Sequence, residues 1–135
     1  MINKDTKIFG SFSKTPGNNG CNFFNEMFVK NNVNAIYKSF YCNDILLCLI
    51  AAVQLKFSGF AVSMPFKEQV ISFLDEVDDC VNEIGACNTV TIKNGKTKGY
   101  NTDWKGVYKY LKSNNIESLS IYGDGGFSKA VQYAC

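Results

Sequence analysis

The sequence predicts an α/β fold built around a mainly parallel sheet. Short apolar segments with strand composition alternate along the chain with amphipathic segments of helical period. Hydrophobic residues make up 46% of the 135 residues and charged residues 19%, which is the composition of a globular chain rather than a disordered one. The length suffices for one domain, or for one domain and part of a second.

The first half of the chain contains three predicted strands and two predicted helices. The strands are Lys7–Phe12, Ala35–Tyr41 and Gly59–Ser63. The segment Cys21–Lys30 follows the turn-rich loop Thr15–Gly20, and its apolar residues recur at helical spacing. A second helix is predicted at Ile45–Leu55, because Asn43 and Asp44 are placed to cap it.

The second half continues this alternation and adds one hairpin. Pro65 suits the first turn of a helix, and Val77–Ile84 is predicted as a short helix closed by Gly85. The dipeptide Asn94-Gly95 favours a tight hairpin turn. The remaining elements are hairpin strands at Asn88–Lys93 and Lys96–Tyr100, a helix at Asp103–Lys112, a strand at Ser118–Tyr122 and a helix at Phe127–Ala134.

The last predicted strand and helix are expected to open a second, incomplete domain. Only 18 residues run from Ser118 to Cys135, whereas a strand–helix–strand unit needs about 30. A lone strand leaves its edge and the apolar surface around it uncovered, so we expect the chain to self-associate or to be partly disordered after about Asn114.

Two residue types are missing from the sequence, and their absence excludes several classes of function. Without His there is no Ser-His-Asp triad, HExxH metalloprotease site or His-ligated haem. Without Arg there is no bidentate fork for phosphates or guanine edges, and a net charge of +2 is too small to indicate nucleic acid or an anionic membrane as a partner. Proton transfer must therefore fall to Lys, Asp, Glu, Tyr or Cys.

The six cysteines are expected to be free thiols. They include no C-x-x-C pair, so no metal site is predicted. The N-terminal residues Met1–Asp5 lack the pattern of a secretory signal, and the longest apolar run, Ile45–Val53, is far shorter than the roughly 20 residues of a membrane span. We therefore expect a cytoplasmic location.

A glycine-rich turn at residues 123–128, GDGGFS, lies between a predicted strand and a predicted helix. Such a turn lets the backbone approach a pyrophosphate, which the helix N-terminus stabilises. Ser128 stands at the third glycine position of G-x-G-x-x-G, and the acidic residue that would read a ribose would lie beyond Cys135. The alternative is a glycine-rich turn of an ordinary α/β protein.

Three polar residues have both a functional and a structural interpretation. Lys67 is expected in the first turn of a helix, where a cation gains nothing from the helix dipole, so a functional role would explain its position. The structural alternative is that Lys67 is one of 14 solvated lysines. Asp103 suits the N-cap of the helix that follows it. Asn88 stands at the start of a strand, where a loop residue is equally reasonable.

The motifs VSMPFKE, IGACNTV, NGKTKGYNTDWKG and GDGGFSKAV occur in this order. Together they resemble the shikimate dehydrogenase family over nearly the whole chain, and the stretch TPGNNGCNFFN is similar to its shikimate dehydrogenase-like subgroup. The resemblance implies a three-layer α/β domain that binds substrate, followed by a Rossmann domain that binds NADP. It implies the reduction of 3-dehydroshikimate to shikimate, on the route to aromatic amino acids.

The resemblance also implies roles for individual residues. Lys67 matches the family's catalytic lysine and Asp103 its aspartate partner, while Asn88, Ser63 and Asp103 match positions that contact substrate. Hydride delivery to a ketone creates an alkoxide, which an ammonium can protonate without a histidine. The phosphate loop corresponds to Gly123, Gly125, Gly126, Phe127 and Ser128.

The N-terminal motif departs from the family pattern S-x-S-P-x-x-H-N, whose serines hold the substrate carboxylate. Counted back from Phe24-Asn25, these serines fall on Asn18 and Gly20. Asn18 can still donate a hydrogen bond to substrate, whereas Gly20 has no side chain. Because lost polar contacts shift specificity strongly, the substrate is less well determined than the Lys67–Asp103 pair.

We expect residues 1–100 to form the substrate-binding domain and residues 101–135 to form a linker helix and the start of the Rossmann domain. The expected ligands are NADP, with NAD as the alternative, and shikimate or a related cyclic polyol acid. Two other functions remain open: a non-catalytic substrate-binding remnant of a truncated gene, or an NAD-dependent quinate/shikimate dehydrogenase when complete. The 135-residue chain alone is expected to be inactive.

Overall fold

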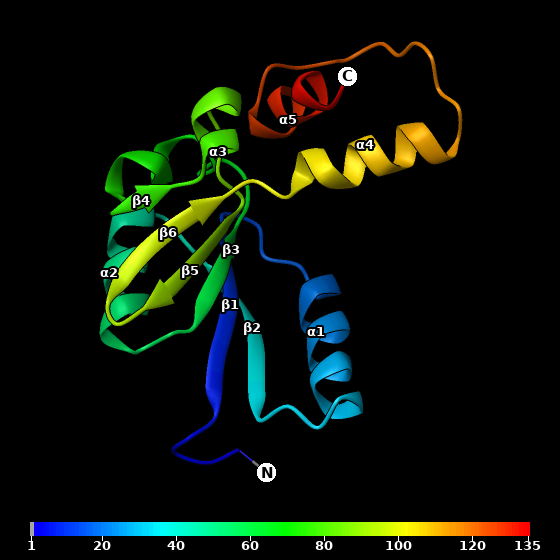
Figure 1. The fold of residues 1–135 in the computed structure, drawn as a ribbon. Coiled ribbons are helices and arrows are strands. Elements are labelled where there is room, and N and C mark those ends of the chain that lie inside the picture. The colour runs from blue at the N-terminus through cyan, green and yellow to red at the C-terminus, as the bar shows by residue number, and fades with distance from the viewer. Residues whose placement is uncertain (1) are drawn as a thin grey trace.

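The computed structural model describes residues 2–135, which form one sheet with helices on both sides (Figure 1). The strands are β1 (Lys7–Ser13), β2 (Ala35–Tyr41), β3 (Gly59–Val62), β4 (Glu76–Val77), β5 (Thr89–Lys93) and β6 (Lys96–Tyr100). The helices are α1 (Asn19–Lys30), α2 (Ile45–Gln54), the 3₁₀ helix η1 (Gln69–Phe73), α3 (Asp79–Ile84), α4 (Asp103–Ser113) and α5 (Gly126–Ala134).

The six strands lie in the order β2-β1-β3-β5-β6-β4. Three of the five neighbouring pairs are parallel, namely β1–β2, β1–β3 and β4–β6, so the prediction of a mainly parallel sheet is confirmed. The antiparallel pairs both involve the predicted hairpin strand β5. Asn94 and Gly95 have φ angles of 52° and 76°, the left-handed conformation at both positions that a tight type I′ hairpin turn requires.

The two faces of the sheet are covered by different helices. Phe9 and Tyr37 are neighbours on β1 and β2, and they pack against Phe28 and Phe24 of α1 at ring-centroid distances of 5.7 and 4.6 Å. Phe12, three positions beyond Phe9, points to the opposite face because successive side chains of a strand alternate. That face packs against α2 in the main core, which includes Phe12, Ile45, Leu49, Phe57, Phe60, Val62 and Val90. The predicted three-layer arrangement is confirmed.

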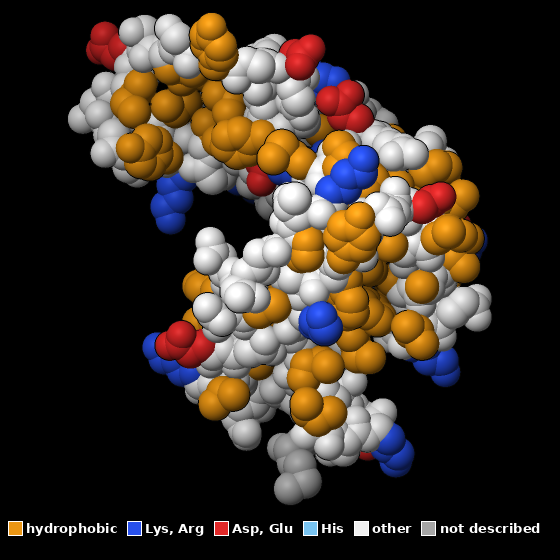
Figure 2. Space-filling view, turned by 180° about the vertical axis from the view of Figure 1, so that it is seen from behind, with side chains coloured by type: hydrophobic (Ala, Val, Ile, Leu, Met, Phe, Trp, Pro, Cys, Tyr) orange, Lys and Arg blue, Asp and Glu red, His pale blue; other side chains and the backbone are white. Residues whose placement is uncertain are grey.

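Helix α5 packs beside α3 and the start of α4. Ala130 is fully buried in a second core cluster with Ile84 and Ala86, and the ring of Tyr133 meets Trp104 edge-on at 5.3 Å. Seen from behind, the molecule is hollowed between the part formed by α4 and α5 and the part that contains α1 (Figure 2). Because α5 packs against α3 and the start of α4, the glycine-rich turn before α5 is held against the part of the molecule that contains the sheet.

The predicted strand at Ser118–Tyr122 is not formed. This segment pairs with no strand among residues 2–135, and it runs as irregular chain between α4 and α5. A strand needs a neighbour to complete its ladder of backbone hydrogen bonds, and local strand composition cannot supply one. Of the strand and helix that were expected to begin a second domain, only the helix, α5, is formed within residues 2–135.

Two smaller predictions also need correction. Residues 64–68 form turns rather than the first turn of a helix at Pro65, and η1 begins later, at Gln69. One reason is that the Lys67 carbonyl accepts a hydrogen bond from the Cys87 N–H at 2.7 Å, which ties this segment to another part of the chain. Val77 belongs to the two-residue strand β4, paired with Gly99 of β6, so α3 begins at Asp79.

All six cysteines are free thiols, in agreement with the sequence. Their surroundings differ: burial raises the pKa of Cys87 to about 11, whereas hydrogen bonding to Ser39 lowers the pKa of Cys21. Within residues 2–135, no helix is long and apolar enough to cross a bilayer.

We expect a thiol-alkylating reagent at pH 8 to modify Cys21 much faster than Cys87 in the folded protein. At that pH only about one thousandth of a thiol of pKa 11 is ionised, and the thiolate is the reacting form. Peptide mass spectrometry after timed alkylation measures both rates. Denatured protein is the control, because its thiols should react alike; equal rates in the folded protein would contradict the structure.

The predicted cap of α2 is formed by Asp44, whose Oδ1 accepts hydrogen bonds from the N–H groups of Leu46 and Leu47 at 2.9 and 3.2 Å. Asp44→Ala should lower the free energy of unfolding by about 1 kcal/mol, since two N–H groups at the helix start lose their partner. Urea unfolding measures the change. Asn43→Ala is the matched control, because that side chain bonds the exposed Tyr41 hydroxyl and not the helix.

Candidate functional site

Lys67 and Asp103 form an ion pair, although 35 residues separate them in the sequence. Lys67 Nζ lies 2.6 Å from Asp103 Oδ2, and the two side chains are only 14% and 20% exposed. The interpretation of Lys67 as a solvated surface lysine is therefore wrong. Asp103 is the first residue of α4, and Thr102 occupies the N-cap position, so the prediction of Asp103 as the cap is also wrong. The Asp103 carboxylate points to Lys67 instead.

Asn88 completes this group and fixes its geometry. Its Nδ2 donates to Asp103 Oδ1 at 2.8 Å, and its Oδ1 accepts hydrogen bonds from the Thr102 N–H and the Thr89 hydroxyl, both at 2.9 Å. The Thr102 N–H can only donate, so the amide oxygen must face it and the amide nitrogen must face Asp103. Three predicted site residues, Lys67, Asn88 and Asp103, are thus brought together.

Asn101 supports this group and was not singled out from the sequence. Its side chain is 1% exposed, donates to the Ala86 carbonyl at 2.8 Å and accepts from the Asp103 N–H at 3.0 Å. It therefore holds the start of α4 against the segment that leads into β5. Its position between a predicted strand and a predicted helix is suited to such a connecting role, because polar residues there can bond free backbone groups. That the Asn101 side chain is buried could not be inferred from one sequence.

The other two predicted substrate contacts lie apart from this hydrogen-bonded group. Ser63 is exposed just beyond the end of β3, and its N–H donates to the Phe12 carbonyl of β1 at 3.0 Å. Asn18 is exposed at the N-cap position of α1. Both residues follow the carboxyl ends of parallel strands, which is the edge where α/β sheets bind ligands.

The glycine-rich turn lies directly beside Lys67. A hollow of about 510 Å³ is lined by Met64, Pro65, Lys67 and Glu68 on one side and by residues 123–128 on the other. A Cβ added at Gly126 would lie 3.0 Å from the Lys67 Cβ and 3.1 Å from the Ala86 Cβ. The turn therefore approaches Lys67 as closely as it does because residue 126 has no side chain.

Two contacts of the turn with its surroundings could not be assigned from the sequence. Lys129 Nζ lies 2.7 Å from Glu68 Oε2, so an ion pair joins the first turn of α5 to the residue after Lys67. The Phe127 ring, which is 53% exposed, has its centroid 5.7 Å from Lys67 Nζ, within range of a cation–π interaction. Both contacts link residues more than 55 positions apart.

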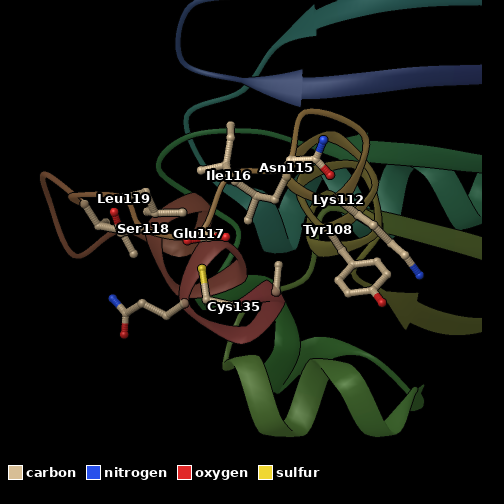
Figure 3. Close-up of a pocket in the computed structure, with 12 residues that line it drawn as sticks. Tyr108, Lys112, Asn115, Ile116, Glu117, Ser118, Leu119 and Cys135 are labelled. Carbon is tan, nitrogen blue, oxygen red and sulfur yellow. The ribbon is translucent and has the colours of Figure 1, made fainter.

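A second hollow, of about 720 Å³, lies between the second half of α4, the segment that follows it and the end of α5. Figure 3 shows Tyr108, Lys112, Ile116, Leu119 and Cys135 around it. Its lining within the described chain comes from α4, the irregular segment after it and the end of α5 rather than from the Lys67 group. We therefore place the candidate site at Lys67, Asn88 and Asp103, with the glycine-rich turn beside it.

A comparison with known protein families shows to which family this chain is related. Residues 13–90 match the family described as "Shikimate dehydrogenase substrate binding domain", which is more than half of the chain. The chain belongs to the shikimate dehydrogenase family. The matched residues include Lys67 and Asn88, whereas Asp103 and the glycine-rich turn lie beyond the match.

Curated relatives extend the similarity to nearly the whole chain. A shikimate dehydrogenase-like protein of Haemophilus influenzae is 39% identical over 97% of this chain, and a shikimate dehydrogenase (NADP(+)) of Aquifex aeolicus is 39% identical over 99%. These matches cover 49% and 52% of the two relatives. The chain thus spans about half the length of the curated relatives it matches.

Solved structures share the fold. A shikimate 5-dehydrogenase-like protein superimposes with a TM-score of 0.89 at 38% identity, over 99% of this chain and 51% of that one. A shikimate 5-dehydrogenase from Listeria monocytogenes, in complex with shikimate and NAD, superimposes with a TM-score of 0.83 at 27% identity, over 96% and 47%. The predicted family and fold class are therefore confirmed.

Gly126→Ala should destabilise the packing of α5 by about 1–3 kcal/mol, because the new methyl group would crowd the Lys67 and Ala86 side chains. Gly125→Ala is the matched control, since a Cβ there would meet no described atom within 4 Å. Denaturant unfolding with Trp104 fluorescence as the probe compares the two variants. Equal stabilities would show that the turn does not rest on Lys67.

Proposed function

We propose that this chain is the substrate-binding part, with the start of the cofactor-binding part, of a shikimate dehydrogenase-like oxidoreductase. The proposed reaction is the NADP-dependent, reversible reduction of 3-dehydroshikimate to shikimate. The observation that carries the proposal is the largely buried pair of Lys67 and Asp103, oriented by Asn88. We further propose that residues 1–100 form the substrate domain and residues 101–135 the linker helix and the start of the cofactor domain.

Lys67 is suited to be the proton donor. An ammonium carries three N–H groups, and the ion pair with Asp103 uses one of them, which leaves two for substrate oxygens. When a ketone is reduced, its oxygen becomes an alkoxide that must be protonated as it forms. A lysine held at a fixed position supplies that proton without a histidine, which this sequence lacks.

Asp103 and Asn88 would position both Lys67 and the substrate. Each carboxylate oxygen of Asp103 accepts one hydrogen bond, Oδ2 from Lys67 and Oδ1 from Asn88, so each retains a lone pair for a substrate hydroxyl. The Asn88 side chain is fixed in turn by Thr102 and Thr89. Substrate hydroxyls would thus meet a carboxylate whose orientation is set before binding.

The glycine-rich turn fits the pyrophosphate of a dinucleotide. Gly123 has a φ of 104°, which favours glycine, and Gly126 leaves the backbone open beside Lys67. No side chain within residues 2–135 caps α5, so the N–H groups of its first turn are free to bind an anion. When bound there, a nicotinamide dinucleotide supplies the hydride. NADP is favoured because the Aquifex relative is named for NADP(+), and NAD is the alternative because the Listeria structure holds NAD.

The test is Lys67→Ala in a protein that joins this chain to the second half its relatives carry. Turnover of shikimate with NADP should fall by about 10²- to 10⁴-fold because the proton donor is lost, while the dissociation constant for shikimate changes much less. NADPH absorbance measures turnover and calorimetry measures binding.

Lys98→Ala is the control for this test, since that lysine pairs with the exposed Glu76 at 3.7 Å on the far edge of the sheet. Turnover at the wild-type rate in Lys67→Ala would overturn the role of Lys67. Parallel assays with NAD and with quinate decide between the two cofactors and between the two substrates. Shikimate binding without any turnover would favour the non-catalytic binding module.

A further inference from the structure

Strand β2 forms one edge of the sheet, and helix α1 runs alongside it (Figure 1). The outer backbone N–H and C=O groups of an edge strand have no strand to bond, so they can pair with another chain. In β2, the backbone groups of Tyr37 and Ser39 point outward, because they bond side chains of α1 rather than groups of β1. The contacts of these two residues therefore decide whether the edge is open.

Two side chains of α1 bond the outward backbone groups of β2. Asn25 bonds both groups of Tyr37: its Nδ2 donates to the Tyr37 carbonyl at 2.8 Å, and its Oδ1 accepts from the Tyr37 N–H at 2.9 Å. Cys21 Sγ accepts a hydrogen bond from the Ser39 N–H at 3.2 Å. The Asn25 amide thus makes the two hydrogen bonds that a residue of a neighbouring antiparallel strand would make.

The spacing of these helix side chains matches the spacing of the strand. Cys21 and Asn25 are separated by four residues of α1, or about 6 Å along the helix axis. Tyr37 and Ser39 are separated by two residues of β2, or about 6.6 Å along the strand. Because Cys21 bonds Ser39 and Asn25 bonds Tyr37, α1 runs in the opposite direction to β2. One turn of the helix therefore covers one repeat of the strand edge.

Lys38 bonds the remaining outward group of this part of the edge. Its Nζ donates to the Ser39 carbonyl at 3.1 Å, so both backbone groups of Tyr37 and of Ser39 are bonded to side chains. The Lys38 side chain is exposed, and lysines on edge strands oppose pairing with another chain because they carry charge to the edge. The edge is thus blocked by hydrogen bonds and by charge.

A second copy of β2 fits the same backbone groups. If two copies pair antiparallel about Lys38, Tyr37 of each copy lies opposite Ser39 of the other, and each such pair exchanges two hydrogen bonds. The strand is rich in aromatic residues, which favours pairing. Each Lys38 would then lie directly opposite its counterpart, and like charges in that position are destabilising. Asn25 and Cys21 therefore bond groups that a second copy would use.

The opposite edge of the sheet offers less to a second copy. Strand β4 has two residues and pairs with Lys98 and Gly99 of β6. Next to this short pairing, the Thr97 N–H of β6 donates to Asp75 Oδ2 at 2.8 Å. Few backbone groups are left to bond there, so β2 is the edge at which a second copy could pair over several residues.

We propose that α1 protects the β2 edge from pairing with a second copy of this chain. Asn25 is the principal contact, because it bonds both backbone groups of Tyr37, and Cys21 and Lys38 bond the two groups of Ser39. Helix α1 and a second copy compete for the same four groups. This inference concerns the association of the chain and does not depend on the proposed function.

The test compares Asn25→Ala with the wild-type chain by analytical ultracentrifugation over a range of protein concentrations. The variant frees both backbone groups of Tyr37 for a second copy, so its dimer dissociation constant should be about tenfold lower than that of wild type, or lower still. Added salt should strengthen the dimer of the variant, because it screens the two facing Lys38 charges. Asn31→Ala is the matched control, since the exposed Asn31 bonds the Met27 carbonyl of α1 and not β2.

Amide hydrogen exchange at Tyr37 shows whether β2 is the surface that pairs. In wild type the Tyr37 N–H is bonded by Asn25, so it should exchange slowly at every protein concentration. In Asn25→Ala the same N–H should exchange fast in dilute solution and slowly once the dimer forms. This dependence on concentration separates pairing at β2 from association through another part of the chain.

Asn25→Asp tests the proposal even if Asn25→Ala does not fold. It keeps the size of the side chain and an acceptor for the Tyr37 N–H, but a carboxylate cannot donate to the Tyr37 carbonyl. This variant should also dimerise more tightly than wild type. A wild-type dimer dissociation constant in the folded variants would overturn the proposal, whether Tyr37 exchanges fast or slowly in them, and it would leave the proposed function standing.

Discussion

The side chain of Asn88 holds the candidate site together. It stands just before β5, and its amide oxygen and nitrogen reach two successive residues, Thr102 and Asp103, across the chain crossing from β6 to α4. This bridge decides where α4 begins and which way the Asp103 carboxylate points. The position of Lys67 follows from it, because its ammonium lies 2.6 Å from that carboxylate while its carbonyl bonds the N–H of Cys87, the neighbour of Asn88. A single amide thereby orders groups from three segments.

Much of the fold could be predicted because its signals are local. The Asn94-Gly95 turn, the Asp44 cap and the helical spacing of α1 each depend on residues close together in the sequence, and the structure confirms them. The strand at Ser118–Tyr122 was predicted wrongly for the opposite reason. Strand composition is local, but a strand exists only where a second strand completes its hydrogen bonds.

The same difference between local signals and contacts of distant segments applies to the candidate site. Lys67, Asn88 and Asp103 were found because they lie in motifs that resemble a known family, and the structure brings them within hydrogen-bonding distance. The parts that were missed are contacts between distant segments: Glu68 with Lys129, and Asn101 with Ala86. None of these pairs has a sequence signature, because each partner alone is an ordinary polar or small residue.

The contact between Gly126 and Lys67 joins the two proposed binding regions, the glycine-rich turn and the Lys67 group. The backbone of the glycine-rich turn rests on the stem of the lysine, and the ion pair between Glu68 and Lys129 fastens the same two segments. A ligand that displaced the turn would therefore displace the stem of the lysine on which it rests. Any resulting change in affinity would be reciprocal between the two proposed binding regions, because binding free energies are linked. The two regions can touch because residue 126 has no side chain.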